Sequence, residues 1–328
     1  MKVNMSKAQE NILVLKSYLN SQILGQERLV DRLLIAVLAD GHLLVEGAPG
    51  LAKTRLVKGL AAGIEARFHR IQFTPDLLPS DLTGTDVFHP ENGSFAFLPG
   101  PLFHNLVLAD EINRSPAKVQ SALLEAMAER QITIGSTTYP LPELFLVMAT
   151  QNPIEQEGTY PLPEAQLDRF LLYVKIDYPD ASVESQILDL ARAEAKQKSL
   201  SMVPPAQVLT QKALFEARQD VLNVFTNDGL TQYMIDLVVA SRYPERYSNS
   251  PLSQWLRFGA SPRATIALDR CSKAHAWLAG RDFVTPEDIH AIAHDVLRHR
   301  LLLTFEAEAE GIQTEQLVDE LLKWVALP

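Results

Sequence analysis

The stretch EGAPGLAKTR, residues 46–55, nearly spells a phosphate-binding loop. The standard pattern is G-x-x-x-x-G-K-[ST], and here an alanine stands at the position of the second fixed glycine. A left-handed backbone at that alanine would cost about 1–2 kcal/mol, whereas a position that requires only a small side chain would accept it. We therefore expect nucleotide binding to survive the exchange. The eight positions of the pattern are Gly47, Ala48, Pro49, Gly50, Leu51, Ala52, Lys53 and Thr54.

The context of this loop favours a phosphate site. A short apolar run at 42–47 ends in glycine, and the segment 56–64 has the apolar spacing of a helix. A strand before the loop and a helix after it direct backbone N–H groups and the helix N-terminus at a phosphate. The alternative is an ordinary surface loop between a strand and a helix.

The rest of the first half alternates between strand-like and helix-like segments. Further apolar runs of strand length are 67–73, 105–111, 144–152 and 170–176, and segments such as 116–130 are helical in pattern. Two helices are expected at 6–19 and 26–39, before the loop. This alternation predicts an α/β domain, a parallel sheet between layers of helices.

The strand-like runs stop after Tyr178 and helical patterns take over, so we place a domain boundary there, with domains 1–179 and 180–328. Two helices of the second domain are marked by their N-terminal caps. Ser261 precedes Pro262, and Thr285 precedes Pro286, in each case with proline at the first helical position.

Composition and charge restrict the compartment in which the protein works and the class of its partners. The chain has 328 residues, of which 47% are hydrophobic, and its single cysteine, Cys271, rules out an intramolecular disulfide. The first twenty residues lack the apolar core of a signal peptide, and the run 33–39 is too short to span a bilayer. We expect a cytoplasmic protein without an integral membrane segment. The net charge of -10 argues against a protein whose main role is to bind nucleic acid.

Two acidic residues end the run LVLADE, residues 106–111, as in a Walker B segment. Asp110 would hold a magnesium ion through its water shell together with the hydroxyl of Thr54, and Glu111 would orient and deprotonate the attacking water. An acidic pair at the end of a strand is also common as a solvated strand end. Together with the upstream loop, the pair predicts an ATP site.

Several segments resemble those of the AAA+ ATPases, and within them of the MoxR family, from Gly25 to the C-terminus. They are GQ at 25–26, EGAPGLAKT, LADEINR, ATQNP, EAQLDRF and SPRA. Alanine before the loop lysine is the variant that MoxR-like proteins carry. The resemblance implies a five-stranded AAA+ sheet with helices on both faces, a smaller all-helical lid domain, and ATP and Mg²⁺ as cofactors.

The resemblance also implies roles for single residues. Gly25 and Gln26 would belong to the nucleotide site, and Asn152 matches sensor 1, which orients water beside the γ-phosphate. Arg169 matches the arginine finger that enters a neighbouring subunit's site, and Arg263 matches sensor 2, which touches the nucleotide from the second domain. The plainer alternatives are a turn asparagine, a surface salt bridge of Arg169 with Asp168 or Glu164, and a solvated first-turn arginine. Arg114 would either face a neighbouring subunit or cap its own helix.

The family implies three functions to choose from. The first is a MoxR-type ATPase that remodels or matures a protein client, as a homo-oligomer in a hexameric ring, often with a partner that contains a von Willebrand A domain. The second is a nucleic-acid motor, because helicases of the MCM type belong to the same branch. The third is a nucleotide-dependent assembly scaffold, which the acidic pair and the arginine finger disfavour.

Two predicted hairpins separate these alternatives. They span 85–100, turning at Asn92 and Gly93, and 131–142, turning at Gly135, and neither contains Lys or Arg. A DNA motor would present cations there, so the hairpins favour a protein client. Their aromatic residues would contact that client or pack inside the hairpin bases: Phe88, Phe95, Phe97 and Tyr139.

His290 and His294 stand at i and i+4 on a predicted helix, but without the glutamate of a metalloprotease motif they do not predict a metal site.

Overall fold

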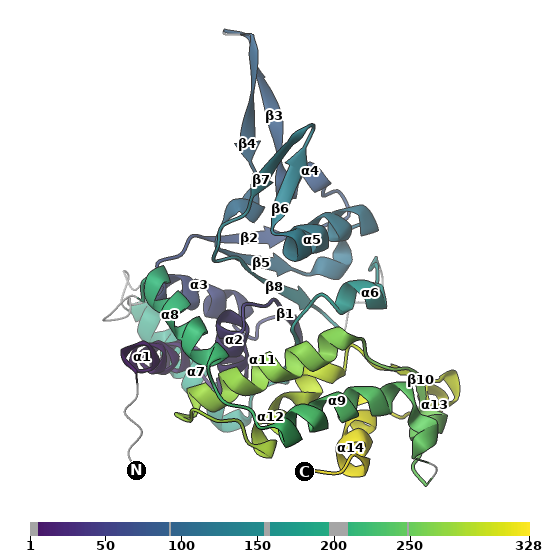
Figure 1. The fold of residues 1–328 in the computed structure, drawn as a ribbon. Coiled ribbons are helices and arrows are strands. Elements are labelled where there is room, and N and C mark those ends of the chain that lie inside the picture. Colours follow the sequence, from purple (N-terminus) through teal and green to yellow (C-terminus); the bar gives the residue numbers. More distant parts are fainter. Residues whose placement is uncertain (1–5, 92, 154–157, 197–208, 248) are drawn as a thin grey trace.

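The structure, a computed structural model, describes residues 6–91, 93–153, 158–196, 209–247 and 249–328. A five-stranded sheet lies at its centre, between layers of helices (Figure 1). All neighbouring strands of this sheet run parallel, as the sequence predicts. In spatial order the strands are β2 (Phe68–Gln72), β5 (Leu106–Asp110), β8 (Leu146–Gln151), β1 (Leu43–Glu46) and β9 (Leu172–Lys175).

Successive residues of the inner strands enter two different hydrophobic cores. Leu106 and Leu108 of β5 belong to one cluster of buried side chains, and Val107 and Ala109 belong to the other. Successive side chains of a strand point to opposite faces, so a sheet covered on both faces needs apolar residues at every position. This requirement explains why the sequence shows continuous apolar runs here and no alternation.

Helices cover both faces of the sheet. The first core is closed by α1 (Lys7–Gln22), α2 (Glu27–Leu38) and α3 (Lys53–Gly63), and the second by α5 (Ala117–Glu129) with the short α4 (Pro79–Thr83). Short helical turns lie between strands, namely η1 (Pro101–Phe103), η2 (Ile112–Arg114) and α6 (Glu164–Leu167). The sequence therefore predicted the class and order of the elements of this half correctly.

Both predicted hairpins are present, and they project from the same side of the molecule (Figure 1). They are formed by β3 (Gly84–His89) with β4 (Ser94–Pro99), and by β6 (Gln131–Ile134) with β7 (Thr137–Pro140). Gly93 and Gly135 take positive φ angles of 63° and 58° at the turns. Asn92, the other predicted turn residue, lies outside the described residues.

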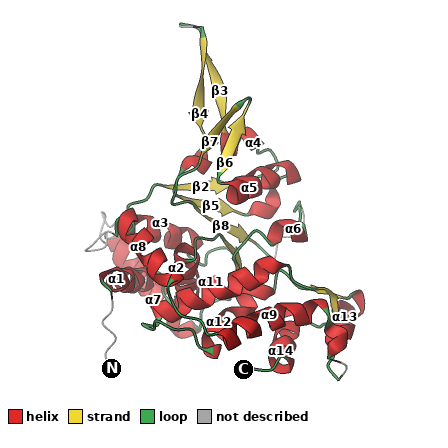
Figure 2. Ribbon diagram, viewed as in Figure 1, coloured by secondary structure: helices red, strands yellow, loops and turns green. Residues whose placement is uncertain are grey.

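The chain after Tyr178 is mainly helical (Figure 2). Ser261 and Thr285 are N-terminal caps, as predicted: the Ser261 hydroxyl accepts a hydrogen bond from the Arg263 N–H, and Thr285 forms a capping box with Asp288. The boundary at residue 179 stays a prediction. The helices are α7 (Ala181–Lys196), α8 (Gln211–Leu222), α9 (Asp228–Arg242), η3 (Pro244–Arg246), α10 (Leu252–Trp255), α11 (Pro262–Leu278), α12 (Pro286–Leu297), α13 (Phe305–Ala309) and α14 (Thr314–Trp324), with the short strands β10 (Leu256–Phe258) and β11 (Leu302–Leu303).

Buried ion pairs fasten the helical part to the sheet and its covering helices. Asp295 of α12 is fully buried and accepts from Arg32 of α2 at 2.6 Å. Arg300 is 8% exposed, donates to Asp168 at 2.8 Å and to the Phe170 carbonyl at 2.6 Å, and so fixes the segment that leads into β9. In the part of the chain that is described, every helix is too short or too polar to cross a membrane.

Candidate active site

The phosphate-binding loop connects the end of β1 to the start of α3. Gly50 and Ala52 both take positive φ angles, 87° and 55°. The backbone at Ala52 is thus left-handed, which is the conformation that favours the glycine of the standard pattern. At Gly47 the loop leaves the sheet so close to Ile176 that a Cβ atom would lie 2.3 Å from its Cγ1.

A cavity of about 370 Å³ opens beside this loop. Lys53 begins α3 at its floor, and its Nζ donates to the Gly47 carbonyl at 2.7 Å. Burial lowers the pKa of Lys53, although the nearby charges of Asp110 and Glu111 act in the opposite direction. The cavity brings two of the four predicted catalytic residues, Glu111 and Asn152, together with the predicted metal ligands and most of the loop. Its lining is Pro49, Gly50, Leu51, Ala52, Lys53, Thr54, Arg55, Arg70, Asp110, Glu111 and Asn152.

Asp110 ends strand β5 and is held by two neighbouring strands. Its Oδ1 accepts from the hydroxyl of Thr150 on β8 at 2.6 Å. Its Oδ2 accepts from Arg70 on β2, from Nη2 at 2.6 Å and from Nε at 3.0 Å. The carboxylate therefore faces the cavity with both oxygens already bonded to protein donors.

Glu111 follows with a left-handed backbone, at a φ of 57°. Its N–H donates to the Thr150 hydroxyl at 2.9 Å, so Thr150 positions both acidic residues. The Glu111 carboxylate accepts from Gln72 at 2.8 Å and pairs with Arg114 at 3.0 Å. Arg114 thus contacts the acid of its own chain, which neither alternative drawn from the sequence included.

Asn152 follows the last residue of β8 and is 7% exposed. It enters the cavity on the side of the two acidic residues, because β8 lies next to both β5 and β1 in the sheet. Its side chain is therefore placed by the same strand ends that place Asp110 and the phosphate-binding loop. This position suits an amide that orients a water molecule near the end of a bound triphosphate.

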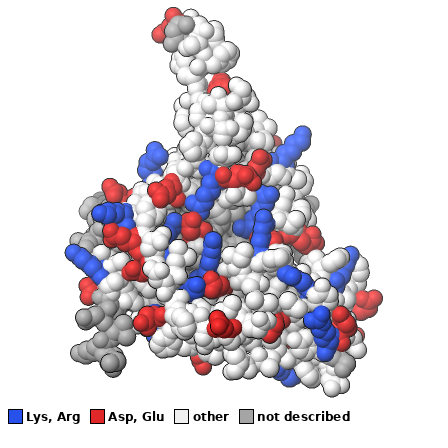
Figure 3. Space-filling model, viewed as in Figure 1, with Lys and Arg blue, Asp and Glu red and all other residues white. Residues whose placement is uncertain are grey.

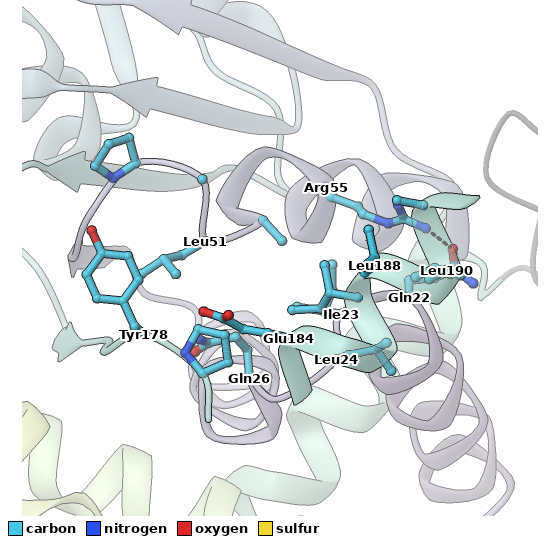
Figure 4. Close-up of a pocket in the computed structure, with 16 residues that line it drawn as sticks. Gln22, Ile23, Leu24, Gln26, Leu51, Arg55, Tyr178, Glu184, Leu188 and Leu190 are labelled. Atoms are coloured by element: carbon cyan, nitrogen blue, oxygen red, sulfur yellow. Dashed lines mark hydrogen bonds between the residues drawn. The ribbon is translucent and has the colours of Figure 1, made fainter. Parts of the chain in front are cut away.

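A second, more apolar cavity of about 500 Å³ adjoins the loop on the side of α1 and α7 (Figure 4). Gly25 turns the chain between α1 and α2 with a φ of 72°, and Gln26 donates to the Asp177 carbonyl at 3.2 Å. Leu51 of the loop and Tyr178, which follows β9, lie close together at one end of this space (Figure 4). A flat apolar base with its sugar suits such a lining, next to a loop that suits the phosphates.

Arg169 and Arg263 lie elsewhere. Both line a cavity of about 280 Å³ beside Gly41 and Phe170, which precede β1 and β9. The phosphate-binding loop follows the C-terminal end of β1, whereas the two arginines lie near the N-terminal ends of β1 and β9. Arg169 Nη1 donates to the Leu124 carbonyl at 2.5 Å, and Arg263 lies 3.7 Å from Asp168. The structure thus separates these two from the other predicted catalytic residues of the chain.

The residues present fit both predicted cofactors. The loop supplies backbone N–H groups, a lysine and a helix N-terminus for phosphates. The Thr54 hydroxyl and the Asp110 carboxylate share the cavity, and oxygen ligands of this kind are those that Mg²⁺ prefers. His290 and His294 instead bond to Tyr233 and Asp319.

Comparison with known proteins agrees with this geometry. Residues 42–172 match the model of the ATPase family associated with various cellular activities (AAA), and residues 253–321 match the AAA lid domain. Chaperone MoxR1 of Mycobacterium tuberculosis is 44% identical over 308 residues, which cover 93% of this chain and 79% of that protein. The chain belongs to the MoxR family of AAA+ ATPases.

Two further relatives support the assignment to this family. Protein MoxR of Paracoccus denitrificans is 31% identical over 94% of both chains. The crystal structure of a "putative ATPase" from Cytophaga hutchinsonii is 45% identical and superposes with a TM-score of 0.89 over 98% of this chain and 96% of that one. The MoxR fold of the chain, a parallel sheet followed by a helical lid region, is therefore found in an experimental structure as well.

Three residues of this site in the MoxR chain were not predicted from the sequence: Arg70, Gln72 and Thr150. All three contact an acidic residue from a neighbouring strand, and their positions follow from strand register, in which Gln72 lies opposite Asp110. Only the polar residues at the ends of two apolar runs could have indicated them. A sequence alone does not show which of these runs lie side by side.

Proposed function

We propose that the protein hydrolyses ATP and uses the energy to remodel or mature a protein client. The observation that supports the ATPase half is the common cavity of Lys53, Thr54, Asp110, Glu111 and Asn152. Lys53 and the loop N–H groups would hold the phosphates, and Thr54 and Asp110 would hold the magnesium ion. Magnesium, when bound, neutralises the charge that develops on the transferring phosphoryl group.

Glu111 is the base in this proposal. Its carboxylate would take a proton from the attacking water, which Asn152 would orient. The left-handed backbone at Glu111 and the hydrogen bond from its N–H to Thr150 position this residue in the lining of the cavity. Arg169 would complete the site of a neighbouring subunit in a homo-oligomeric ring. Arg263, which lines the same cavity as Arg169, would touch the nucleotide from the second domain.

The hairpins support a protein client. Phe88 and Phe95 are paired directly across β3 and β4 and are 50% and 70% exposed, whereas Phe97 stacks on Tyr139 at 4.1 Å and joins the two hairpins. The projecting end is formed mainly of uncharged residues, with acidic residues at its tip (Figure 3). Exposed aromatic groups without cations suit an apolar polypeptide better than a phosphate backbone.

The test is ATP turnover, measured as phosphate release, with and without an unfolded protein such as casein. Glu111→Gln should lower turnover about 100-fold or more and leave ATP binding intact, because it removes only the base. Phe95→Ser should leave basal turnover unchanged and reduce the stimulation by casein. The control is Phe225→Ser, which removes an aromatic ring that is 64% exposed on the helical part of the molecule.

Equal turnover in the wild type and Glu111→Gln would disprove the hydrolysis mechanism. Turnover stimulated by single-stranded DNA and lost in Phe95→Ser would instead favour the nucleic-acid motor.

A further inference from the structure

Asp110, the carboxylate assigned to magnesium, is already paired with a cation of its own chain. Arg70 directs two donors, Nε and Nη2, at the single oxygen Oδ2, at 3.0 and 2.6 Å. The hydroxyl of Thr150 takes the other oxygen at 2.6 Å. An ionised carboxylate only accepts hydrogen bonds and has about four lone-pair sites, so these three donors leave one site, on Oδ1, and none on Oδ2.

The side chains of Asp110 and Arg70 differ in how freely they can move. Asp110 is fixed, because its side chain is 13% exposed and β5 lies between β2 and β8 in the sheet. The Arg70 side chain is 47% exposed and extends from β2, the edge strand of the sheet. An exchange at this carboxylate therefore requires only the rotation of one arginine side chain, while the backbone of both strands stays in place.

Arg70 also has a second acceptor within reach. Its Nη2 lies 2.8 Å from Oε1 of Gln72, and Gln72 in turn donates to Glu111 at 2.8 Å. The guanidinium can therefore leave Asp110 and still keep a hydrogen bond inside the cavity that it lines. There it would face the phosphates of a nucleotide bound by Lys53 and the loop.

We propose that Arg70 is a positioning residue that competes with magnesium for Asp110 and thereby sets how much magnesium the protein needs to bind nucleotide tightly. The inference rests on the proposed ATP site. Arg70 must release Asp110 before Oδ2 can accept from the water shell of the ion. The pair is partly exposed to solvent, so its strength is modest and the exchange is reversible.

The experiment measures binding of a fluorescent ADP analogue, mant-ADP, as a function of free magnesium; ADP excludes turnover from the readout. Arg70→Gln should lower the magnesium concentration at the midpoint of tight binding about two- to fivefold, the range expected when one exposed ion pair no longer competes. Arg70→Lys should shift the midpoint in the same direction by less, because lysine keeps the charge and loses the two-pronged contact. Arg67→Gln is the matched control, since Arg67 precedes the opposite end of β2 and donates to the Phe103 carbonyl.

The outcomes separate this inference from the proposed function. A wild-type protein that binds no mant-ADP at any magnesium concentration would overturn both. Binding with the same midpoint in the wild type and Arg70→Gln would overturn the competition alone. The competition would also be overturned if Arg70→Lys kept the wild-type midpoint while Arg70→Gln shifted, or if Arg67→Gln shifted equally, because charge alone would then explain the effect.

Discussion

Two residues of the candidate site, Ala52 and Glu111, have a left-handed backbone conformation. Among the described residues, four other than glycine have positive φ angles, and two of these, Ala52 and Glu111, line the phosphate cavity. A side chain in this conformation costs about 1–2 kcal/mol, so the surrounding contacts must hold both residues there. At Glu111 the bond from its N–H to Thr150 does so. At Ala52 the strain is the consequence of the alanine that distinguishes this loop from the standard pattern.

Replacing Ala52 by glycine should stabilise the protein. Glycine adopts the left-handed conformation without strain, and after the greater freedom of the unfolded glycine is subtracted, about 0.5–1 kcal/mol should remain. Urea unfolding at neutral pH measures the difference. The control is Ala61→Gly within α3, which should destabilise by about 1 kcal/mol because it loses helix propensity. Destabilisation of similar size in both variants would show that the left-handed angle at Ala52 carries no strain.

The sequence indicated the placement of a candidate site residue where one segment contains both the residue and its context. Asp110 and Asn152 lie at the ends of apolar runs, and Lys53 lies in a loop pattern between an apolar run and a helical segment, so the sequence alone indicated their positions. Arg70 and Thr150 act through contacts between strands, which depend on register and strand order. The left-handed angle at Ala52 was left open because it depends on how the loop closes on the helix.

A buried histidine lies at the N-terminal end of β1. At the N-terminal end of β1, His42 lies between two other elements: its Nδ1 accepts from the Val147 N–H at 3.1 Å, and its Nε2 lies 3.3 Å from the Met127 carbonyl. The N–H of Val147 can only donate, so Nδ1 carries no proton and Nε2 does. Burial, and then the charge of Arg130, lower the pKa of His42 from 6.5 to about 4.

This histidine should make the protein less stable in mild acid. The unfolded chain binds a proton at His42 below about pH 6.5 and the folded protein does so only near pH 4, so stability falls as the pH drops through this window. At pH 5 the loss should be about 2 kcal/mol. The free energy of unfolding is measured with urea at pH 7 and at pH 5. Its difference between the two pH values should be smaller in His42→Gln than in the wild type by this amount.

Other groups contribute to the same pH dependence in both proteins and cancel in the comparison; one is the buried His299, whose pKa is also lowered by burial. The matched control is His89→Gln on the exposed face of β3, which should retain the wild-type pH dependence. Identical slopes for the wild type and His42→Gln would contradict the assignment of this pH dependence to His42.

At the scale of the whole molecule, the groups proposed to be catalytic lie at opposite ends of the strands of one sheet. The phosphate-binding loop lies beyond the C-terminal end of β1, and Arg169 lies near its N-terminal end; a strand of four residues spans about 13 Å. Arg300 donates to Asp168 and to the Phe170 carbonyl and so holds the segment that carries Arg169 against the helical part. This distance from the loop of its own chain supports the proposal that Arg169 acts on the phosphate site of another copy.

The ATP sites should thus lie between subunits, and this can be tested with two inactive variants. Arg169→Ala leaves a subunit with an intact Glu111, and Glu111→Gln leaves one with an intact Arg169, so each variant alone should turn over little ATP. In an equal mixture that co-assembles, about a quarter of the interfaces should combine both intact groups and regain activity. Mixing Glu111→Gln with Lys53→Ala is the control, because both variants damage the cavity of their own chain and no interface can be complete. Phosphate release that stays at the level of the separate variants, across mixing ratios in which subunits demonstrably exchange, would place the action of Arg169 outside the ATP site.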